Sequence, residues 1–136
     1  MIVTPEGVQT TWSFQKCETN VCNPDDGKSN TTKLIAYSNE HGIIFPAAEL
    51  CAQYSKNSIK PGEGFLPAIN QLKQIVVNWK IINPALARIN GEVLQGWIWS
   101  SSENSSYNAR FVLAYNGYVD WGHKLYDRYV RCILAF

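Results

Sequence analysis

The sequence is poor in charge, and the charge that it has is balanced. Charged residues make up 17% of the 136 residues and the formal net charge is +1, whereas an average domain holds about 25% charged residues. No run of lysine or arginine occurs. The chain therefore lacks the basic patch that a nucleic-acid groove or an anionic membrane surface requires, and neither partner is expected.

Long apolar runs are also missing. No stretch reaches the roughly 20 apolar residues of a membrane-spanning helix, so we expect no membrane insertion. Residues 1–15 lack the basic start and apolar centre of a signal peptide. The location that we expect is extracellular, at a cell surface or in a phage particle. A trimmed secreted chain or export by another route would both lead there.

Motifs of catalysis are scarce too. His41 and His123 are far apart and have no metal-ligand spacing, and neither a Gly-x-Ser-x-Gly elbow nor a glycine-rich phosphate loop occurs. Asp25 is followed by a second aspartate within a turn sequence, where solvation is the ordinary role. A carboxylate pair could still form from distant residues such as Glu103 and Asp120. Without positive signals of an active site, we expect no enzyme activity, no cofactor and no metal.

Apolar and aromatic residues, by contrast, are plentiful. Apolar residues make up 46% of the chain, enough for a core, and the length suits one domain over residues 1–136. Most of the aromatic residues lie between Trp97 and Phe136, together with many Ser, Asn and Gly residues. That mixture is typical of binding surfaces, so residues 97–136 are expected to present a ligand-binding sheet and loops.

Three segments have helical signals. Pro46 suits the first position of a helix that we expect to end near Tyr54. An apolar stripe predicts a second helix over residues 69–79. A short third helix is predicted between Asn83, as the N-cap before a proline, and Gly91, as the C-terminal stop.

Strand signals dominate from residue 97 onward. Asn116-Gly117 is the strongest short hairpin signal, and it separates two strand candidates. Helices followed by antiparallel strands predict an α+β fold with two main helices, in which the C-terminal strand closes the domain. Residues 1–26 are expected to be mostly irregular. The strand candidates are Val8–Phe14, Lys33–Tyr37, Trp97–Trp99, Ala109–Tyr115, Tyr118–Trp121 and Tyr129–Leu134.

The four cysteines allow three interpretations. Two disulfides would pair Cys17 with Cys22 and Cys51 with Cys132, provided that the first helix packs on the last strand. Four free thiols, with Cys51 and Cys132 as small buried apolar side chains, are the alternative. A zinc site formed by the Cys17–Cys22 pair and His41 is the third.

Several short motifs resemble those of one family. In order along the chain they resemble the motifs of C-type-lectin-fold domains of gut bacteria and their phages, in the branch related to formylglycine-generating enzyme. The resemblance implies that fold and also a Cys51–Cys132 bridge. The segments that carry the resemblance are Gly27–Thr31 (GK-x-NT), Ala47–Tyr54 (AAE-x-C-x-x-Y), Gly64–Leu72 (similar to DWYLPSxxEL), Trp99–Glu103 (similar to YWSSSE), Asn108–Ala109 (similar to NA of NAW) and Val130–Phe136 (similar to VRPVRAF).

Departures from the family limit what the resemblance implies. The calcium and sugar motifs of animal lectins are absent, and the catalytic cysteine pair of formylglycine-generating enzyme has no match, so neither activity is implied. The motifs also differ at Gln71, Arg110 and Cys132. The C-terminal pattern is similar to the variable proteins of diversity-generating retroelements, in which side chains between fixed anchors vary. Tyr118–Arg128 has such mixed chemistry, although an ordinary surface hairpin would look the same.

We therefore expect a domain that binds a cell-surface protein or glycan. The alternative is a structural adhesin, pilus-tip or virion decoration module, with homo-oligomers or a larger assembly as its partners. Under either hypothesis, Trp99 is expected in the core, with the serines of Ser100–Glu103 capping a loop that Glu103 fixes as a hydrogen-bond acceptor. The expected ligand contacts are Trp97, Tyr107, Arg110, Tyr115, Tyr118, Asp120, Trp121, His123, Tyr126, Asp127 and Arg128.

Overall fold

The α+β class is confirmed by the computed structural model, which describes residues 1–135. Phe136, the last residue of the predicted ligand-presenting segment, lies outside the described residues. Four helices form within residues 1–135 where the sequence predicted two main ones and a short third. They are α1 (Gly27–His41), α2 (Pro46–Ala52), α3 (Ile69–Val77) and α4 (Trp79–Arg88).

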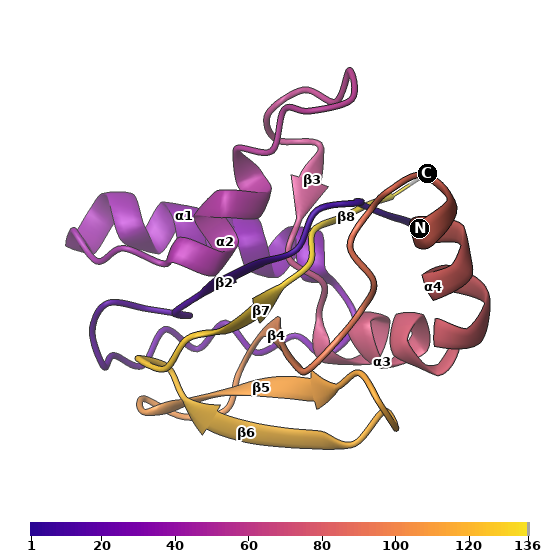
Figure 1. Cartoon of the computed structure of the whole chain (residues 1–136). Coiled ribbons are helices and arrows are strands. Elements are labelled where there is room, and N and C mark those ends of the chain that lie inside the picture. The colour runs from indigo at the N-terminus through magenta and orange to yellow at the C-terminus, as the bar shows by residue number, and fades with distance from the viewer. Residues whose placement is uncertain (136) are drawn as a thin grey trace.

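The strands form two sheets (Figure 1). In the smaller sheet β8 (Ile133–Leu134) lies between β1 (Ile2–Val3) and β3 (Gly64–Phe65), so the two ends of the chain run side by side. The C-terminal strand thus closes the fold, as predicted. The larger sheet has the order β2-β7-β4-β5-β6, with β4 and β7 parallel. Its strands are β2 (Val8–Thr10), β4 (Trp97–Glu103), β5 (Asn108–Leu113), β6 (Val119–His123) and β7 (Arg128–Val130).

Helix α1 corrects the prediction of a strand over Lys33–Tyr37. The Asp26 side chain caps the helix by accepting from the Ser29 backbone N–H, and Gly42 ends it in the left-handed conformation. Its buried positions include the polar Asn30 and Thr31. Because this helix packs through polar side chains, it has no apolar stripe in the sequence.

The other helices lie close to their predicted places. Helix α2 begins at Pro46 as expected and ends at Ala52. Helix α3 ends at Val77, and one residue, Asn78, separates it from α4. Pro84 was expected at the start of a helix, but it lies inside α4, which begins five residues earlier. The N-cap prediction at Asn83 was therefore wrong, and the Asn83 side chain instead bonds both backbone groups of Leu94.

Two hydrophobic clusters lie on opposite faces of the larger sheet. Trp99 and Phe111 belong to one cluster with residues of α1 and α2, whereas their neighbours Ile98 and Val112 belong to the other with α3. Alternation along a strand explains this division, because successive side chains point to opposite faces. Both faces of β4 and β5 are covered, whereas the edge strands β2 and β6 contain no buried residue.

The segment Ser100–Glu103 continues β4 and is not a loop. All three serines are buried, and their hydroxyls replace the apolar contacts of an ordinary inner strand. Ser100 Oγ donates to the Arg110 carbonyl and Ser102 Oγ donates to the Asn23 carbonyl. The first bond lies within the sheet and the second ties the sheet to the irregular N-terminal segment. Because the hydroxyls are satisfied in this way, a run of serines can extend a buried strand.

Candidate functional site

The β5–β6 hairpin carries most of the predicted ligand contacts. It forms the lower edge of the molecule in Figure 1, on the side away from α1 and α2. Asn116-Gly117 lies in the turn, as predicted, but the turn also includes residues 114–115, so β5 ends at Leu113 and not at the predicted Tyr115. Gly117 has φ of 74°, its N–H donates to the Leu113 carbonyl, and the Leu113 N–H donates to the Tyr118 carbonyl. The turn therefore fixes the register of the two strands.

Aromatic side chains in and around this hairpin are unusually exposed. Tyr115 is 80% exposed and Trp121 is 53% exposed, although both are large rings that proteins usually cover. Asp127 is also exposed, while Trp97 and Arg128 are half-buried. The aromatic side chains more than half exposed here are those of Tyr107, Tyr115, Tyr118, Trp121 and Tyr126.

Strand register divides the predicted residues between two faces. Arg110 pairs with Trp121, and Phe111 pairs with Asp120. Because paired residues share a face and neighbours alternate, Arg110 and Trp121 lie on one face, while Asp120 lies with Phe111 on the other. His123 is two residues from Trp121 and shares its face. The ring of Tyr126 lies against His123, with centroids 5.4 Å apart.

On the same face as Asp120 lie the side chains of Trp97, Tyr118 and Arg128. The Trp97 ring meets the edge of Phe111 at a centroid distance of 4.7 Å, and Tyr118 meets Trp97 at 6.5 Å. The Arg128 guanidinium lies over the Phe111 ring, with Cζ 4.3 Å from its centroid. Four of the predicted contacts thus surround Phe111.

Tyr107 and Tyr115 lie apart from these two groups. The ammonium of Lys16 lies 4.8 Å from the centroid of the Tyr107 ring. Tyr115 follows β5 and lines a cavity of about 250 Å³ together with Trp79 and Leu94. The structure therefore gathers the eleven predicted residues on one hairpin region, but not on a single flat face.

Lys124 is the residue that sequence analysis missed. Its side chain is fully buried and donates to Glu103 Oε2 at 2.7 Å and to the Cys17 carbonyl at 2.8 Å. The Lys124 backbone carbonyl also accepts from Trp12 N–H. The hydrophobic periodicity of a sequence gives no indication that a lysine at the end of an exposed strand is buried. Only its partner, Glu103, was predicted as an acceptor.

The hydrogen bonds of Glu103 confirm the predicted acceptor role of its carboxylate. It accepts the backbone N–H groups of Thr19 and Asn20 and the Thr19 hydroxyl, besides the Lys124 ammonium. All its capacity serves the fold, so it stabilises the loop between Cys17 and Val21. Asp120, the other member of the suggested carboxylate pair, lies on β6 and accepts the backbone N–H of Trp121.

One of the two possible disulfides is present. Cys51 and Cys132 are bonded, with Cα atoms 5.2 Å apart, and join α2 to the segment before β8. Cys17 and Cys22 are free thiols, so the prediction of a second bridge between them was wrong. Burial raises the pKa of the Cys17 thiol, and the charge of Lys124 opposes that rise. Stable disulfides are typical of proteins in oxidising compartments.

Residues 1–135 lack two further features. No group of three or more His, Cys, Asp or Glu side chains there is placed to hold a metal ion. None of the helices in that part of the chain combines the length and the apolar character needed to cross a membrane.

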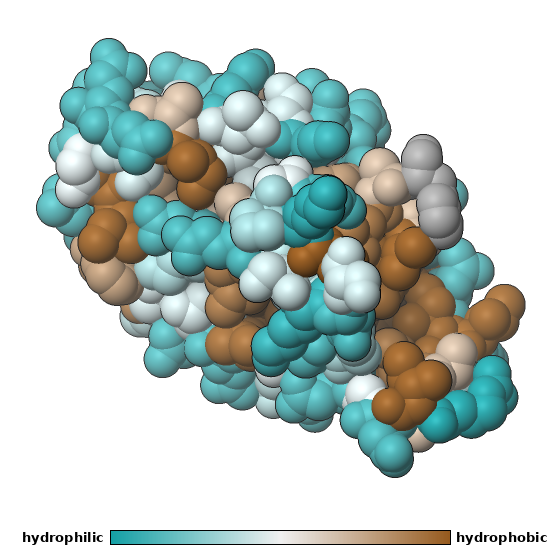
Figure 2. Space-filling view, turned by 90° about the horizontal axis from the view of Figure 1, so that it is seen from above, coloured by the Kyte–Doolittle hydropathy of each residue, from teal (hydrophilic) through white to brown (hydrophobic). Residues whose placement is uncertain are grey.

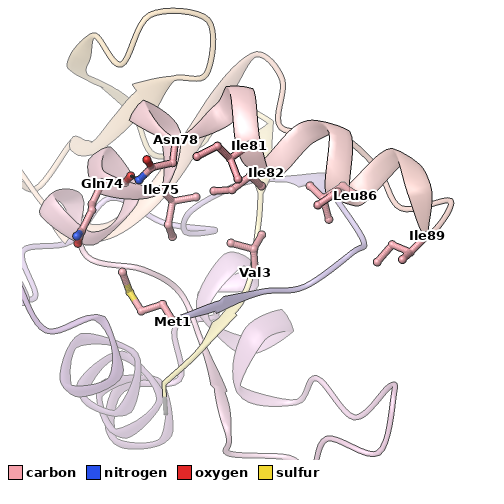
Figure 3. Close-up of a pocket in the computed structure, with 10 residues that line it drawn as sticks. Met1, Val3, Gln74, Ile75, Asn78, Ile81, Ile82, Leu86 and Ile89 are labelled. Carbon is pink, nitrogen blue, oxygen red and sulfur yellow. Dashed lines mark hydrogen bonds between the residues drawn. The ribbon is translucent and has the colours of Figure 1, made fainter.

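An apolar groove lies on another side of the molecule. It has a volume of about 500 Å³ between α3, α4 and β1. Figure 2 shows hydrophobic surface gathered at the end where α4 lies, and in Figure 3 Met1 and Val3 point toward Ile75 and Ile82 across the groove. Ile81 on its rim is 73% exposed. None of the lining side chains is charged: Met1, Val3, Gln74, Ile75, Asn78, Ile81, Ile82, Ala85, Leu86 and Ile89.

Comparisons with known proteins show the fold. No protein-family model matches the sequence, and no curated protein matches it either. Among solved structures, a fimbrial protein from Bacteroides ovatus ATCC 8483 aligns with a TM-score of 0.71 at 14% identity. The alignment covers 98% of this chain but 35% of the fimbrial chain. The chain thus spans about a third of that protein's length, and the likeness concerns the fold alone.

Proposed function

We propose that this chain is the recognition module of an extracellular adhesin or fimbrial assembly. The observation that carries the proposal is the group of five aromatic side chains, each more than half exposed, around the β5–β6 hairpin. Tyr and Trp provide large contact areas with little loss of conformational entropy, and they are enriched at binding hot spots. No structural need of the fold accounts for their exposure.

An extracellular assembly fits two other findings. The Cys51–Cys132 disulfide favours an oxidising location such as the outside of a cell. The fold is shared with part of a protein described as fimbrial. We expect the chain to be a non-enzymatic module that works without cofactor or metal, because Glu103, its most deeply buried acid, is used by the framework.

The partner that we propose is a protein or glycan on a cell surface. Eleven side chains would supply the contacts, in two groups. Arg110, Trp121, His123 and Tyr126 would form one group. The other group consists of Trp97, Tyr118, Asp120 and Arg128, with Tyr107, Tyr115 and Asp127 at the margins.

The resemblance to C-type-lectin-like variable proteins is a finer form of the same proposal. In those proteins varied side chains sit on a fixed scaffold. The hairpin here would tolerate such variation, because residues such as Trp121 and Tyr126 lie outside both core clusters. A near-copy of the DNA for residues 97–136, differing mainly at adenines and located beside a reverse transcriptase gene, would support diversification. A search of the flanking DNA that finds neither would contradict it.

The binding proposal is tested with a paired substitution. The labelled chain is applied to an immobilised panel of glycans and cell-surface proteins, and the variant Trp121→Ala/Tyr126→Ala is compared with it. We expect at least a tenfold loss of affinity for the bound panel member, about the effect of removing hot-spot residues. Phe14→Ala is the matched control, because Phe14 is equally exposed but lies outside the hairpin. Equal losses in both variants would contradict the proposal.

A second function, packing within an assembly, is favoured by the α4 groove. Permanent interfaces are more apolar than recognition surfaces, and the groove carries no charged side chain. In this proposal the groove covers a second copy of the chain. Sedimentation at rising concentration is expected to show a dimer that Ile81→Asp abolishes and Trp121→Ala leaves intact. A wild-type chain that stays monomeric throughout would contradict it.

A further inference from the structure

The side chain of Arg128 takes an unusual course across the sheet. Arg128 begins β7, yet its guanidinium reaches over β4 and β5, with Cζ 5.5 Å from the Trp99 ring centroid and 4.3 Å from that of Phe111. It ends beside β6, where a Cβ atom added at Gly122 would lie 3.0 Å from Arg128 Nη2. Aromatic rings below and a glycine beside it hold the guanidinium in one place.

This guanidinium lacks the partners that buried arginines usually have. Arg128 Nε is buried and has no hydrogen-bond partner among residues 1–135. Burial lowers the pKa of Arg128, and the charges of Asp120 and Tyr126 oppose that change. Arg131 is the internal comparison, because its side chain is more deeply buried and its guanidinium donates to the carbonyls of Thr4 and Val93. Arg131 is therefore satisfied by the fold, and Arg128 is not.

The neighbours of Arg128 provide both apolar and acidic contacts. Trp97 packs on the same Phe111 ring, and Tyr118 packs on Trp97. Asp120 is the cross-strand partner of Phe111 and so lies on this face. One oxygen of Asp120 accepts the backbone N–H of Trp121. Its other oxygen remains as an acceptor for a ligand hydroxyl.

We propose that Arg128 binds the carboxylate of an acidic sugar, a ring that carries both a carboxylate and hydroxyl groups. This inference rests on the proposed recognition function and names the ligand class for one face of that site. Because Arg128 Nε is buried, the two Nη groups would face the ligand, and they form a planar fork that matches a carboxylate. Asp120 would accept a sugar hydroxyl, and its negative charge disfavours a doubly charged phosphate more than a singly charged carboxylate.

The test follows the Arg128 Nε–H resonance by NMR while glucuronate is added. We expect a saturable shift, and glucose or inorganic phosphate should cause little. Arg128→Gln should weaken glucuronate binding about tenfold, and Arg128→Lys should also weaken it, because an ammonium lacks the fork. Arg88→Gln is the matched control, since Arg88 is an exposed arginine at the end of α4 and lies outside the proposed binding surface. Asp120→Asn should strengthen binding of acetate, which has only the charge, and should reduce the preference for glucuronate over acetate.

Melting curves separate a binding role from a structural one. Arg128→Gln removes a guanidinium that contacts the Trp99 and Phe111 rings but makes no hydrogen bond among residues 1–135, so its melting temperature should fall by only a small amount. Arg131→Gln should melt lower, because two buried carbonyls lose their donors. A large destabilisation by Arg128→Gln would overturn the inference.

Two other results would also overturn it. One is that glucuronate at saturation leaves the Arg128 resonance unmoved, and the other is that an acidic peptide is preferred over glucuronate. The inference can also fail while the proposed function holds. If Arg128→Gln keeps full affinity for the panel member while Trp121→Ala/Tyr126→Ala loses it, this inference is wrong and the recognition module stands.

Discussion

Trp121 and Lys124 lie three residues apart on the same strand and turn, and their environments are the reverse of what their chemistry suggests. The tryptophan is 53% exposed, and the lysine is fully buried. Lys124 is held by an ion pair, a backbone carbonyl and the ring of Trp12, whose centroid lies 4.8 Å from Nζ. Trp121 belongs to neither core cluster.

The contrast separates a framework from a surface. The framework consists of the Cys51–Cys132 disulfide, which joins α2 to the segment before β8, and of the buried end of β4 and the Lys124–Glu103 pair, which tie the sheet to the N-terminal segment. The surface consists of side chains around β6 that the fold does not need. A rigid scaffold with free side chains is what a recognition module requires. The predictions below test this separation, from the largest expected effect to the smallest.

Loss of the disulfide should affect the framework most. The double variant Cys51→Ala/Cys132→Ala opens a connection between residues 81 positions apart, and loop-entropy models give about 4 kcal/mol for a closure of this length. Denaturant unfolding, with and without reductant, measures the free energy of unfolding. If reductant lowers the stability of the wild type but not of the variant, the bridge is the cause.

Removal of the buried ammonium should be nearly as damaging. Lys124→Met leaves the Glu103 carboxylate buried without its counter-charge, a change that typically destabilises by about 3 kcal/mol. The control is Lys16→Met, since Lys16 lies on the surface beside Tyr107. Unfolding curves that coincide for the two variants would show that Lys124 is not part of the framework.

A smaller effect is expected at the hairpin turn. Gly117 has φ of 74°, and an alanine there is strained by about 1 kcal/mol. Its Cβ would meet only Val77 Cγ1 at 3.7 Å, an ordinary contact. Urea unfolding of Gly117→Ala tests this value. A loss as large as that of Lys124→Met would mean that the hairpin belongs to the framework.

The smallest effect concerns the free thiols and leaves the fold intact. Without reductant, alkylation should modify two cysteines, Cys17 and Cys22, and leave the bonded pair unmodified. Cys17 should react more slowly than Cys22, because burial raises the pKa of its thiol and restricts access, whereas Cys22 is exposed. Peptide mass spectrometry over time gives both results. Modification of all four cysteines in the native chain would contradict the framework described here.

Features that depend on neighbouring residues could be predicted from the sequence. The Asn116-Gly117 turn, the start of α2 at Pro46 and the acceptor role of Glu103 are examples. Each depends on turn chemistry, on a fixed backbone angle or on the position of a single acid after a strand. The Cys51–Cys132 bridge was also foreseen, as one of several alternatives and as an implication of family resemblance.

Features that depend on distant partners could not be predicted. Helix α1 buries Asn30, whose amide donates to Ser101 Oγ, so its inner face looks polar in the sequence. Lys124 pairs with Glu103, but a lone lysine next to exposed aromatic residues resembles a surface residue. The contact between Arg128 and Phe111 likewise could not be predicted without knowledge of the strand order, because β7 and β5 are not adjacent in the sheet.

The most direct test of the separation measures stability and binding on the same two proteins. Trp121→Ala/Tyr126→Ala and Lys124→Met are each melted and then applied to the panel of glycans and cell-surface proteins. We expect the aromatic variant to lose binding while its free energy of unfolding stays within about 0.5 kcal/mol of the wild-type value, as is usual for surface substitutions. Lys124→Met should lose stability and keep binding at temperatures where it is folded. If the aromatic variant instead unfolds with full loss of cooperativity, its residues are core and the recognition surface does not exist.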